Sequence, residues 1–461
     1  LVALNWLSHH TEGFLYDTGA YGLDYSAPRA VYDRSAITAM ANDTAAAADD
    51  ARAMERILDR WAERNAPLGP AGAKPKLLLI STSGGGQRSM LWSLRCMQVA
   101  DSMLGGTLMQ RAALVTGSSG GLIGAAYYRQ LAHADLLHGS RTRFDRALLE
   151  EVSADMLNPI AFSFVTNDMF IRWRSVRDGP RRYTLDRAEA FERRLNANTR
   201  GLLDIRLGHM ADAERRAEAP LLVAAPVSIN DGRRVLISAQ PAAHLTAITP
   251  GSRLNALSQA EAIEFRRFFS AHQPDSLKLT SALRMNASFP YITPVTTLPS
   301  APAMRLMDAG VRDNYGYRTM LSFLHAHKGW IERNTSGVVL LQLRDTQKEL
   351  EVRPSSSSLF GRVIDPVGSV YDNFVRVQDQ DYDYMLRLFG QPGSVPLEVI
   401  DVQLRHGDQE RISLSWHLTR VERERVLRTV GSPDNRAALE RLAAIVGHPP
   451  AAVADASAPA R

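Results

Sequence analysis

Two glycine-rich segments of this chain have the composition that acyl transfer from a serine requires. The second of them, GSSGG at residues 117–121, has the G-x-S-x-G form. In that form a tight turn between a strand and a helix lifts a serine hydroxyl, here that of Ser119, clear of a sheet. The first, SGGGQR at residues 83–88, can place backbone N–H groups around a developing oxyanion. We therefore treat Ser119 as a candidate nucleophile.

Three consecutive glycines also occur in phosphate-binding loops. A Walker loop would continue with Gly-Lys-Ser/Thr, whereas Gln87-Arg88-Ser89 stands here, and the G-x-G-x-x-G pattern of dinucleotide sites is absent. The oxyanion interpretation needs only N–H donors. Arg88, at the start of the following helix, is a candidate substrate-binding residue that either steadies the loop or meets a lipid phosphate. A surface salt bridge is the alternative for Arg88.

Both segments follow apolar runs that are typical of buried strands. Residues 76–82 (KLLLIST) and 112–116 (AALVT) are apolar at their centres, and amphipathic helices follow both loops. This order predicts parallel strands joined by a right-handed crossover. Neighbouring parallel strands lie about 4.8 Å apart. If these two are adjacent, the glycine loop therefore lies close to Ser119.

The α/β pattern continues along the chain. Further strands are expected at residues 221–229, 234–239, 304–307, 337–343 and 395–402. Further helices are expected at residues 44–65, 258–270, 367–389, 419–430 and 435–446. We expect an N-terminal arm and helix over 1–65, a catalytic domain over 66–447 and a disordered tail over 448–461.

Composition narrows the classes of site and partner. The 461 residues include 54 basic and 49 acidic ones, for a net charge of +5. The single cysteine, Cys96, excludes an internal disulfide and a cysteine-based zinc framework. Neither zincin spacing of histidines nor an EF-hand loop occurs, so we expect no metal and no cofactor. No nucleic-acid-binding motif occurs, so nucleic acid is not an expected partner.

The sequence also bears on membrane contact. No apolar run reaches 18 residues, so no segment is expected to span a bilayer. The chain begins at Leu1 instead of methionine, and a membrane anchor upstream is compatible with that. Residues 159–194 mix phenylalanine and tryptophan with arginines, as in a lid that docks on an anionic membrane. A core segment followed by a solvated loop is the alternative. We expect a cytoplasmic or peripheral membrane location.

A third motif follows the first two in order. It is Met307-Asp308-Ala309-Gly310-Val311-Arg312-Asp313-Asn314, and SALRMNASFPYITP at 281–294 precedes it. With SGGGQR and GSSGG these segments resemble the patatin-like phospholipase family over roughly residues 76–345. Ser83 stands where plant patatins have aspartate, so the loop is more similar to that of the cytosolic phospholipase A2 group. No motif is recognisable after about residue 350.

The resemblance implies a fold and a chemistry. The fold is α/β, a three-layer α/β/α sandwich with a mainly parallel central sheet. The activity is that of a lipid acyl hydrolase, which cleaves carboxylic esters of phospholipids or lysophospholipids. Ser119 would be the nucleophile and Asp308 its base, with Gly84, Gly85 and Gly86 as the oxyanion hole. An aspartate with its ordinary pKa of about 3.9 is a weak base, so Asp308 needs an apolar site.

Three alternatives remain open from the sequence. An esterase with an α/β-hydrolase triad would combine Ser119 and Asp308 with His417 or His406. A transacylase would replace water with an alcohol or a lysolipid as acyl acceptor. A lipid-binding scaffold would keep the fold without the chemistry.

Overall fold

Strand β2 (Leu77–Thr82) lies inside a ten-stranded sheet, and all six of its residues are buried. It precedes the first glycine loop. The computed structural model describes residues 18–68, 72–169, 174–246, 260–289, 292–348, 376–387, 395–404 and 412–447. The expected tail at 448–461 lies outside these residues.

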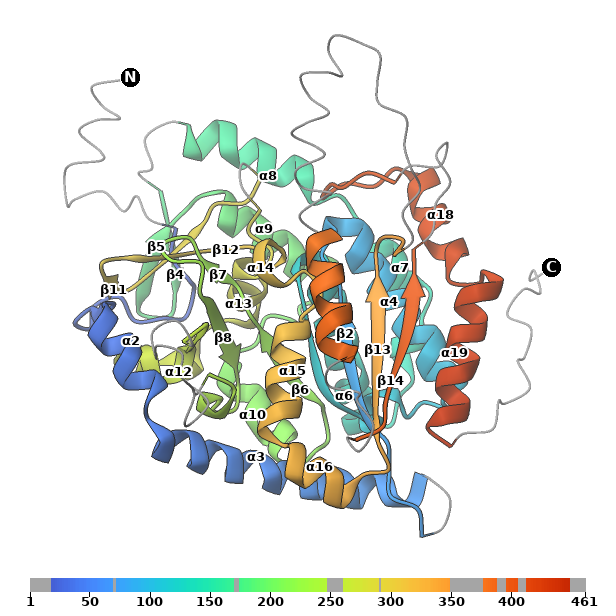
Figure 1. Ribbon diagram of the computed structural model, residues 1–461. Coiled ribbons are helices and arrows are strands. Elements are labelled where there is room, and N and C mark those ends of the chain that lie inside the picture. Colours follow the sequence, from blue (N-terminus) through green and yellow to red (C-terminus); the bar gives the residue numbers. More distant parts are fainter. Residues whose placement is uncertain are drawn as a thin grey trace.

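One half of the sheet is parallel. Its strands run in the order β6-β3-β2-β13-β14. Their bounds are Leu221–Ala224 for β6, Ala112–Gly117 for β3, Val338–Arg344 for β13 and Leu397–Gln403 for β14. Strands β2 and β3 are direct neighbours, the arrangement in which the sequence predicts that the glycine loop lies close to Ser119. Their carboxyl ends therefore bring the two glycine-rich loops to the same edge (Figure 1).

The other half is mainly antiparallel. From β6 it continues through β8 (Arg234–Ser238), β7 (Val227–Ser228), β12 (Met304–Met307) and β10 (Thr296–Leu298). Strands β7 and β8 form a hairpin in which Gly232 N–H bonds to the Ser228 carbonyl over 2.8 Å, where Asn230-Asp231-Gly232 predicts one. The sheet as a whole is mixed, with its parallel half carrying the glycine loops.

The expected helix at 258–270 is wrong over its described part. Residues Ala262–Glu264 form strand β9, which pairs with β8, and only Phe265–Phe268 make a helical turn, α12. All three β9 residues are buried. The Glu264 carboxylate then accepts hydrogen bonds from the N–H groups of Arg266 and Arg267, which starts α12. Pairing with β8 and this side-chain cap together outweigh the local helical pattern.

Alternate residues of β2 pack in two different apolar cores, one on each face of the sheet. Leu78 and Ile80 pack in the core that includes helices α4 (Gly86–Met103) and α6 (Ser119–His138). Leu77 and Leu79 pack in the core that includes α3 (Thr44–Asn65) and α15 (Tyr317–Ala326). Helices thus cover both faces (Figure 1). The fold is the expected α/β sandwich of three layers.

Several remaining helices follow the expected ranges. Helix α3 begins and ends as predicted, and α18 (Arg420–Thr429) and α19 (Pro433–Ile445) match two expected C-terminal helices. Residues 376–387 are helical, and residues 367–375 and 388–389 of the expected helix lie outside the described residues. Among the described helices none is both long enough and apolar enough to cross a membrane.

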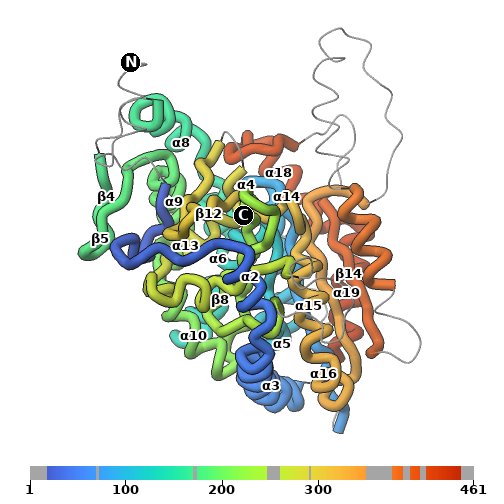
Figure 2. The backbone as a smooth tube through the Cα atoms, turned by 60° about the vertical axis from the view of Figure 1, so that its left-hand side comes forward, coloured from blue at the N-terminus to red at the C-terminus, as the bar shows by residue number. Residues whose placement is uncertain are grey.

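The N-terminal residues that the structure describes make contacts with residues 281 and 300–301, far along the chain. Strand β1 (Ala30–Val31) pairs with β11 (Ser300–Ala301), and the Tyr21 N–H donates to the Ser281 hydroxyl over 2.9 Å. Helix α3 lies at the end of the molecule opposite α8 (Leu157–Ser163) in two views related by a rotation about the vertical axis (Figures 1 and 2).

Candidate active site

Ser119 occupies a strained turn between β3 and α6. Its φ is +50°, in the left-handed region that non-glycine residues avoid. The preceding strand ends at Gly117, and the Ser119 N–H donates to the Asn286 carbonyl over 3.1 Å. Such strain persists only where the surroundings hold the residue in place. The turn therefore has the backbone geometry of a nucleophile elbow.

Glycines let this turn approach the first loop closely. A Cβ atom on Gly120 would lie 1.8 Å from the Gly86 carbonyl oxygen, and one on Gly121 would lie 2.2 Å from that of Ser83. Neither distance allows a side chain. The start of α6 therefore rests directly on the backbone of the glycine loop.

Asp308 follows β12 and lines the same cleft as Ser119. Its side chain is buried, with 4% of the residue exposed. Its Oδ1 accepts hydrogen bonds from the Gly310 N–H at 2.7 Å and from the Ser118 hydroxyl at 3.0 Å. The Asp308 N–H donates to the Ser288 carbonyl over 3.0 Å. Backbone and side-chain contacts thus fix the position of the carboxylate.

The environment of Asp308 changes its basicity. Burial raises its pKa to about 6, while hydrogen bonds from Gly310, Ser119 and Ser118 act in the opposite direction. Removal from water disfavours the charged carboxylate, and hydrogen bonds to the charged form favour it. Because the pKa stays below 7, the carboxylate is ionised at neutral pH and is a better base than an exposed aspartate.

Asn286 joins the turns that carry these two groups. Its backbone carbonyl accepts hydrogen bonds from the N–H of Ser119 at 3.1 Å and of Ala309 at 3.2 Å. Its side-chain amide donates to the Gly117 carbonyl over 3.1 Å, and its Oδ1 accepts from Ala225 N–H over 2.9 Å. Sequence reasoning included Asn286 only within the 281–294 segment. Its bridging role depends on contacts between distant segments.

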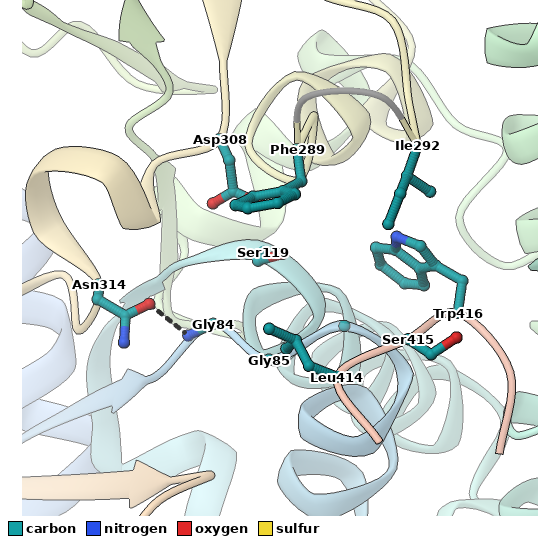
Figure 3. A pocket seen from close by; sticks show the side chains of 11 residues that line it. Gly84, Gly85, Ser119, Phe289, Ile292, Asp308, Asn314, Leu414, Ser415 and Trp416 are labelled. Atoms are coloured by element: carbon teal, nitrogen blue, oxygen red, sulfur yellow. Dashed lines mark hydrogen bonds between the residues drawn. The ribbon is translucent and has the colours of Figure 1, made fainter. Parts of the chain in front are cut away.

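The glycine loop offers fewer free donors than the sequence indicates. The Gly84 N–H already bonds to Asn314, to its carbonyl oxygen at 3.1 Å and to its Oδ1 at 3.2 Å (Figure 3). Among the described residues the N–H groups of Gly85 and Gly86 have no acceptor. Gly86 is also the first residue of α4, whose positive dipole end points to the cleft. Gly85 and Gly86 are therefore the amides available to an oxyanion.

Arg88 does not line the cleft. Its guanidinium pairs with Asp345 over 2.8 Å and donates to the Ile412 carbonyl over 2.7 Å, and 11% of its side chain is exposed. Asp345 also accepts a hydrogen bond from the Ser83 hydroxyl over 2.8 Å. Of the two roles expected for Arg88, these contacts fit the one that steadies the loop.

The cleft has an apolar wall that the sequence did not reveal. Its lining includes Phe289 and Ile292 from the 281–294 segment and Leu414, Ser415 and Trp416 from the C-terminal region (Figure 3). The last three residues lie beyond any recognisable motif. They are brought to the loop by long-range pairing, since the Gln87 N–H donates to the Ser415 carbonyl over 2.9 Å.

His417, a candidate for the triad, does not line this cleft. The Nδ1 atom of His417 lies 3.1 Å from Asp155 Oδ1, and its side chain is 47% exposed. His406 lies outside the described residues. Within the described ranges no three His, Cys, Asp or Glu side chains are grouped to hold a metal.

This chain is similar to solved structures of a human cytosolic phospholipase A2. Human GIVD cytosolic phospholipase A2 in complex with methyl γ-linolenyl fluorophosphonate is 14% identical, with a TM-score of 0.43, over 87% of this chain and 64% of that one. The same human enzyme without the inhibitor gives 13% identity and a TM-score of 0.41, over 87% of this chain and 66% of that one.

A more distant structure, VipD from Legionella pneumophila, gives 10% identity and a TM-score of 0.30, over 80% of this chain and 67% of that one. This chain thus spans about two thirds of the length of these proteins. No curated protein matches the sequence. The sequence model of the patatin-like phospholipase family, however, matches residues 80–321, more than half of the chain. With the ordered loops of Gly84, Ser119 and Asp308, this match shows that the chain belongs to the patatin-like phospholipase family.

Proposed function

We propose that this protein hydrolyses carboxylic esters of phospholipids or lysophospholipids through a Ser119–Asp308 dyad. The observation that carries the proposal is that Ser119, at positive φ, shares a cleft with the buried and hydrogen-bonded Asp308. The family membership gives the reaction class, a lipid acyl hydrolase. The dyad, the oxyanion donors and the substrate are our assignments.

The first half-reaction forms an acyl-enzyme. The Asp308 carboxylate accepts the Ser119 hydroxyl proton while Oγ attacks the ester carbonyl carbon. The carbonyl π bond opens, and its oxygen becomes an oxyanion that accepts hydrogen bonds from Gly85 and Gly86 N–H. When the intermediate collapses, the bond to the leaving alkoxide breaks and Asp308 returns the proton to it. The alcohol, a lysophospholipid or a glycerophosphodiester, then leaves.

The second half-reaction restores the enzyme. Asp308 accepts a proton from water as the water oxygen attacks the acyl carbon. A second tetrahedral intermediate forms in the same oxyanion site, and its collapse breaks the bond to Ser119 Oγ, which takes the proton back. A free fatty acid is released. The apolar wall of Phe289, Ile292, Leu414 and Trp416 suits the acyl chain, because apolar surface removed from water favours binding.

The proposal is tested by fatty-acid release from mixed phospholipid vesicles and by hydrolysis of a soluble short-chain ester. Ser119→Ala and Asp308→Asn should each abolish both activities, while His417→Ala should keep them. Loss of both activities in His417→Ala as well would favour the triad esterase, because a triad needs Ser119, Asp308 and the histidine together. Acyl transfer to added lysolipid without fatty-acid release would identify a transacylase. Lipid binding without turnover in the wild type would identify a scaffold.

A further inference from the structure

A cluster of large apolar side chains is exposed on α8 and the π-helical turn that follows it, Phe164–Asp168. Phe162 is 71% exposed, Val165 52% and Met169 60%. We call these three residues the apolar face. Exposed apolar residues scattered singly are ordinary on protein surfaces, but three within eight positions of the chain form a patch that water disfavours.

Arginines lie beside the apolar face. The hairpin of β4 (Ser175–Asp178) and β5 (Arg181–Thr184) follows in sequence and lies next to α8 in both views (Figures 1 and 2). Arg174, Arg177 and Arg182 are exposed there, and none has an ion-pair partner among the described residues. These three are called the hairpin arginines below.

The acidic residues of the same segments are already neutralised. Asp168 pairs with Arg187 over 3.4 Å, and Asp178 pairs with Arg206 over 2.5 Å. The Arg187 guanidinium also lies 4.7 Å from the centre of the Phe164 ring. The hairpin arginines therefore give this surface an uncompensated positive charge. Apolar side chains flanked by free cations complement an anionic lipid surface, whereas a purely apolar partner would leave the arginines unpaired.

Helix α8, which carries part of this surface, begins beside a residue that lines the cleft. The N–H groups of Met156 and Leu157, at the start of α8, donate to the Trp416 carbonyl over 3.0 and 3.1 Å. Trp416 lines the cleft, as does Leu414, which is 48% exposed. The arrowheads of β13 and β14 in Figure 1 point to the end of the molecule where α8 lies, and the Ser119 turn is at that end as well.

We propose that the apolar face and the hairpin arginines form a docking surface for anionic phospholipid bilayers. The apolar face enters the boundary between head groups and acyl chains, and the arginines pair with lipid phosphates around it. Docking in this orientation holds the cleft against the lipid surface. This inference rests on the proposed function, since it names the form in which that site meets its substrate.

The test is sedimentation of the full chain with vesicles, carried out in the Ser119→Ala background so that the lipid is not consumed. Vesicles of phosphatidylcholine alone are compared with vesicles that also contain phosphatidylglycerol. Phe162→Ser/Val165→Ser/Met169→Ser should weaken binding to both by about tenfold or more. Arg174→Ser/Arg177→Ser should weaken binding only to the anionic vesicles, again by about tenfold, and salt should remove that difference.

Matched controls lie at the other end of the molecule. Leu136 and Leu137, at the end of α6, are 51% and 61% exposed, and Leu136→Ser/Leu137→Ser should leave vesicle binding unchanged. Arg56 and Arg333 are exposed on α3 and α16 (Lys328–Asn334), and Arg56→Ser/Arg333→Ser should also bind as the parent does. Equal losses of vesicle binding in the control and test variants would overturn the proposal, because binding would then depend on nonspecific hydrophobic contact or on net charge.

A second readout separates this proposal from the catalytic one. With Ser119 restored, the docking variants should hydrolyse a soluble short-chain ester at the wild-type rate and lose activity only on vesicles. Wild-type binding to vesicles by the apolar variant would overturn the docking surface and leave the dyad standing. If the wild type self-associates and the apolar variant is monomeric, the membrane proposal is overturned, and the apolar face instead binds a second copy of this chain. Absent ester hydrolysis in the wild type would overturn the dyad, while the vesicle binding stays measurable.

Discussion

The hydroxyl of Ser118 donates a hydrogen bond to Oδ1 of Asp308 over 3.0 Å. Two consecutive serines in the G-x-S-x-G turn thus face the same carboxylate, and they differ in backbone conformation. Ser119 lies in the left-handed region at the tip of the turn, whereas Ser118 is extended, with φ −124° and ψ 150°. We assign Ser118 as a positioning residue, which orients the proposed base Asp308.

Ser118→Ala should move the acid limb of the pH profile to higher pH. The lost hydrogen bond stabilises the charged carboxylate, so its removal raises the pKa of Asp308 further above about 6. A shift of about one pH unit is expected, because a hydrogen bond to a charged group is worth about 1.5 to 3 kcal/mol. The measurement is kcat against pH on a soluble ester. Ser93→Ala is the control, since the buried Ser93 hydroxyl has no partner among the described residues. An acid limb at the wild-type pH would show that the Ser118 bond is incidental.

Asp308→Asn should make the protein more stable at high pH while it abolishes activity. The folded-state pKa of Asp308, about 6, lies above the ordinary value of about 3.9 that the unfolded chain shows. The folded state therefore binds more protons between these values, and the contribution of Asp308 to stability is lost as pH rises through 6. The gain from Asn should appear above about pH 6 and vanish below about pH 4.

The measurement for this variant is the free energy of unfolding in denaturant at several pH values. Asp381→Asn, on an exposed aspartate outside the cleft, controls for the loss of one charge. A gain that is the same at every pH would contradict the assigned pKa.

Ser119→Gly should be more stable than Ser119→Ala, by about 1 kcal/mol. Both variants lack the nucleophile, and they differ only in the Cβ atom that is strained at φ +50°. Glycine adopts this conformation without a steric penalty. The comparison uses denaturant unfolding of the two proteins, both of which should be inactive. Equal stabilities would mean that the turn relaxes without cost once the hydroxyl is gone.

Gly85→Ala should lower kcat by about a hundredfold or more, the scale expected when an oxyanion donor is displaced. The new Cβ would lie 2.1 Å from Asp345 Oδ2, at a backbone φ of +148° that alanine disfavours, so the loop must move. Gly139→Ala is the matched control, because Gly139 also has a positive φ, +64°, and nothing lies within 4 Å of its Cβ position. The control should cost about 1 kcal/mol of stability and keep the wild-type kcat.

Much of this protein could be predicted from local sequence. Strands β2 and β3 follow from their apolar runs, and helix α3 follows from its amphipathic pattern. Both signals can be read from neighbouring residues, because side-chain burial repeats with the period of the element. The glycine loop and the Ser119 turn are equally local, because their backbone angles require particular residue types. The order of three such motifs also indicated the family before any contact was known.

The tertiary structure decided which partners each group meets. Asn314 accepts the Gly84 N–H, which is then not available to the proposed oxyanion site. Asp345 holds Arg88 in an ion pair outside the cleft. Trp416, from a region without a recognisable motif, completes the apolar wall of the cleft. In the same way, residues 262–264 were expected to be helical but form a strand because they pair with β8. Residue type fixes what a side chain can donate, accept or bury, but its partner depends on distant segments that meet only when the sheet assembles.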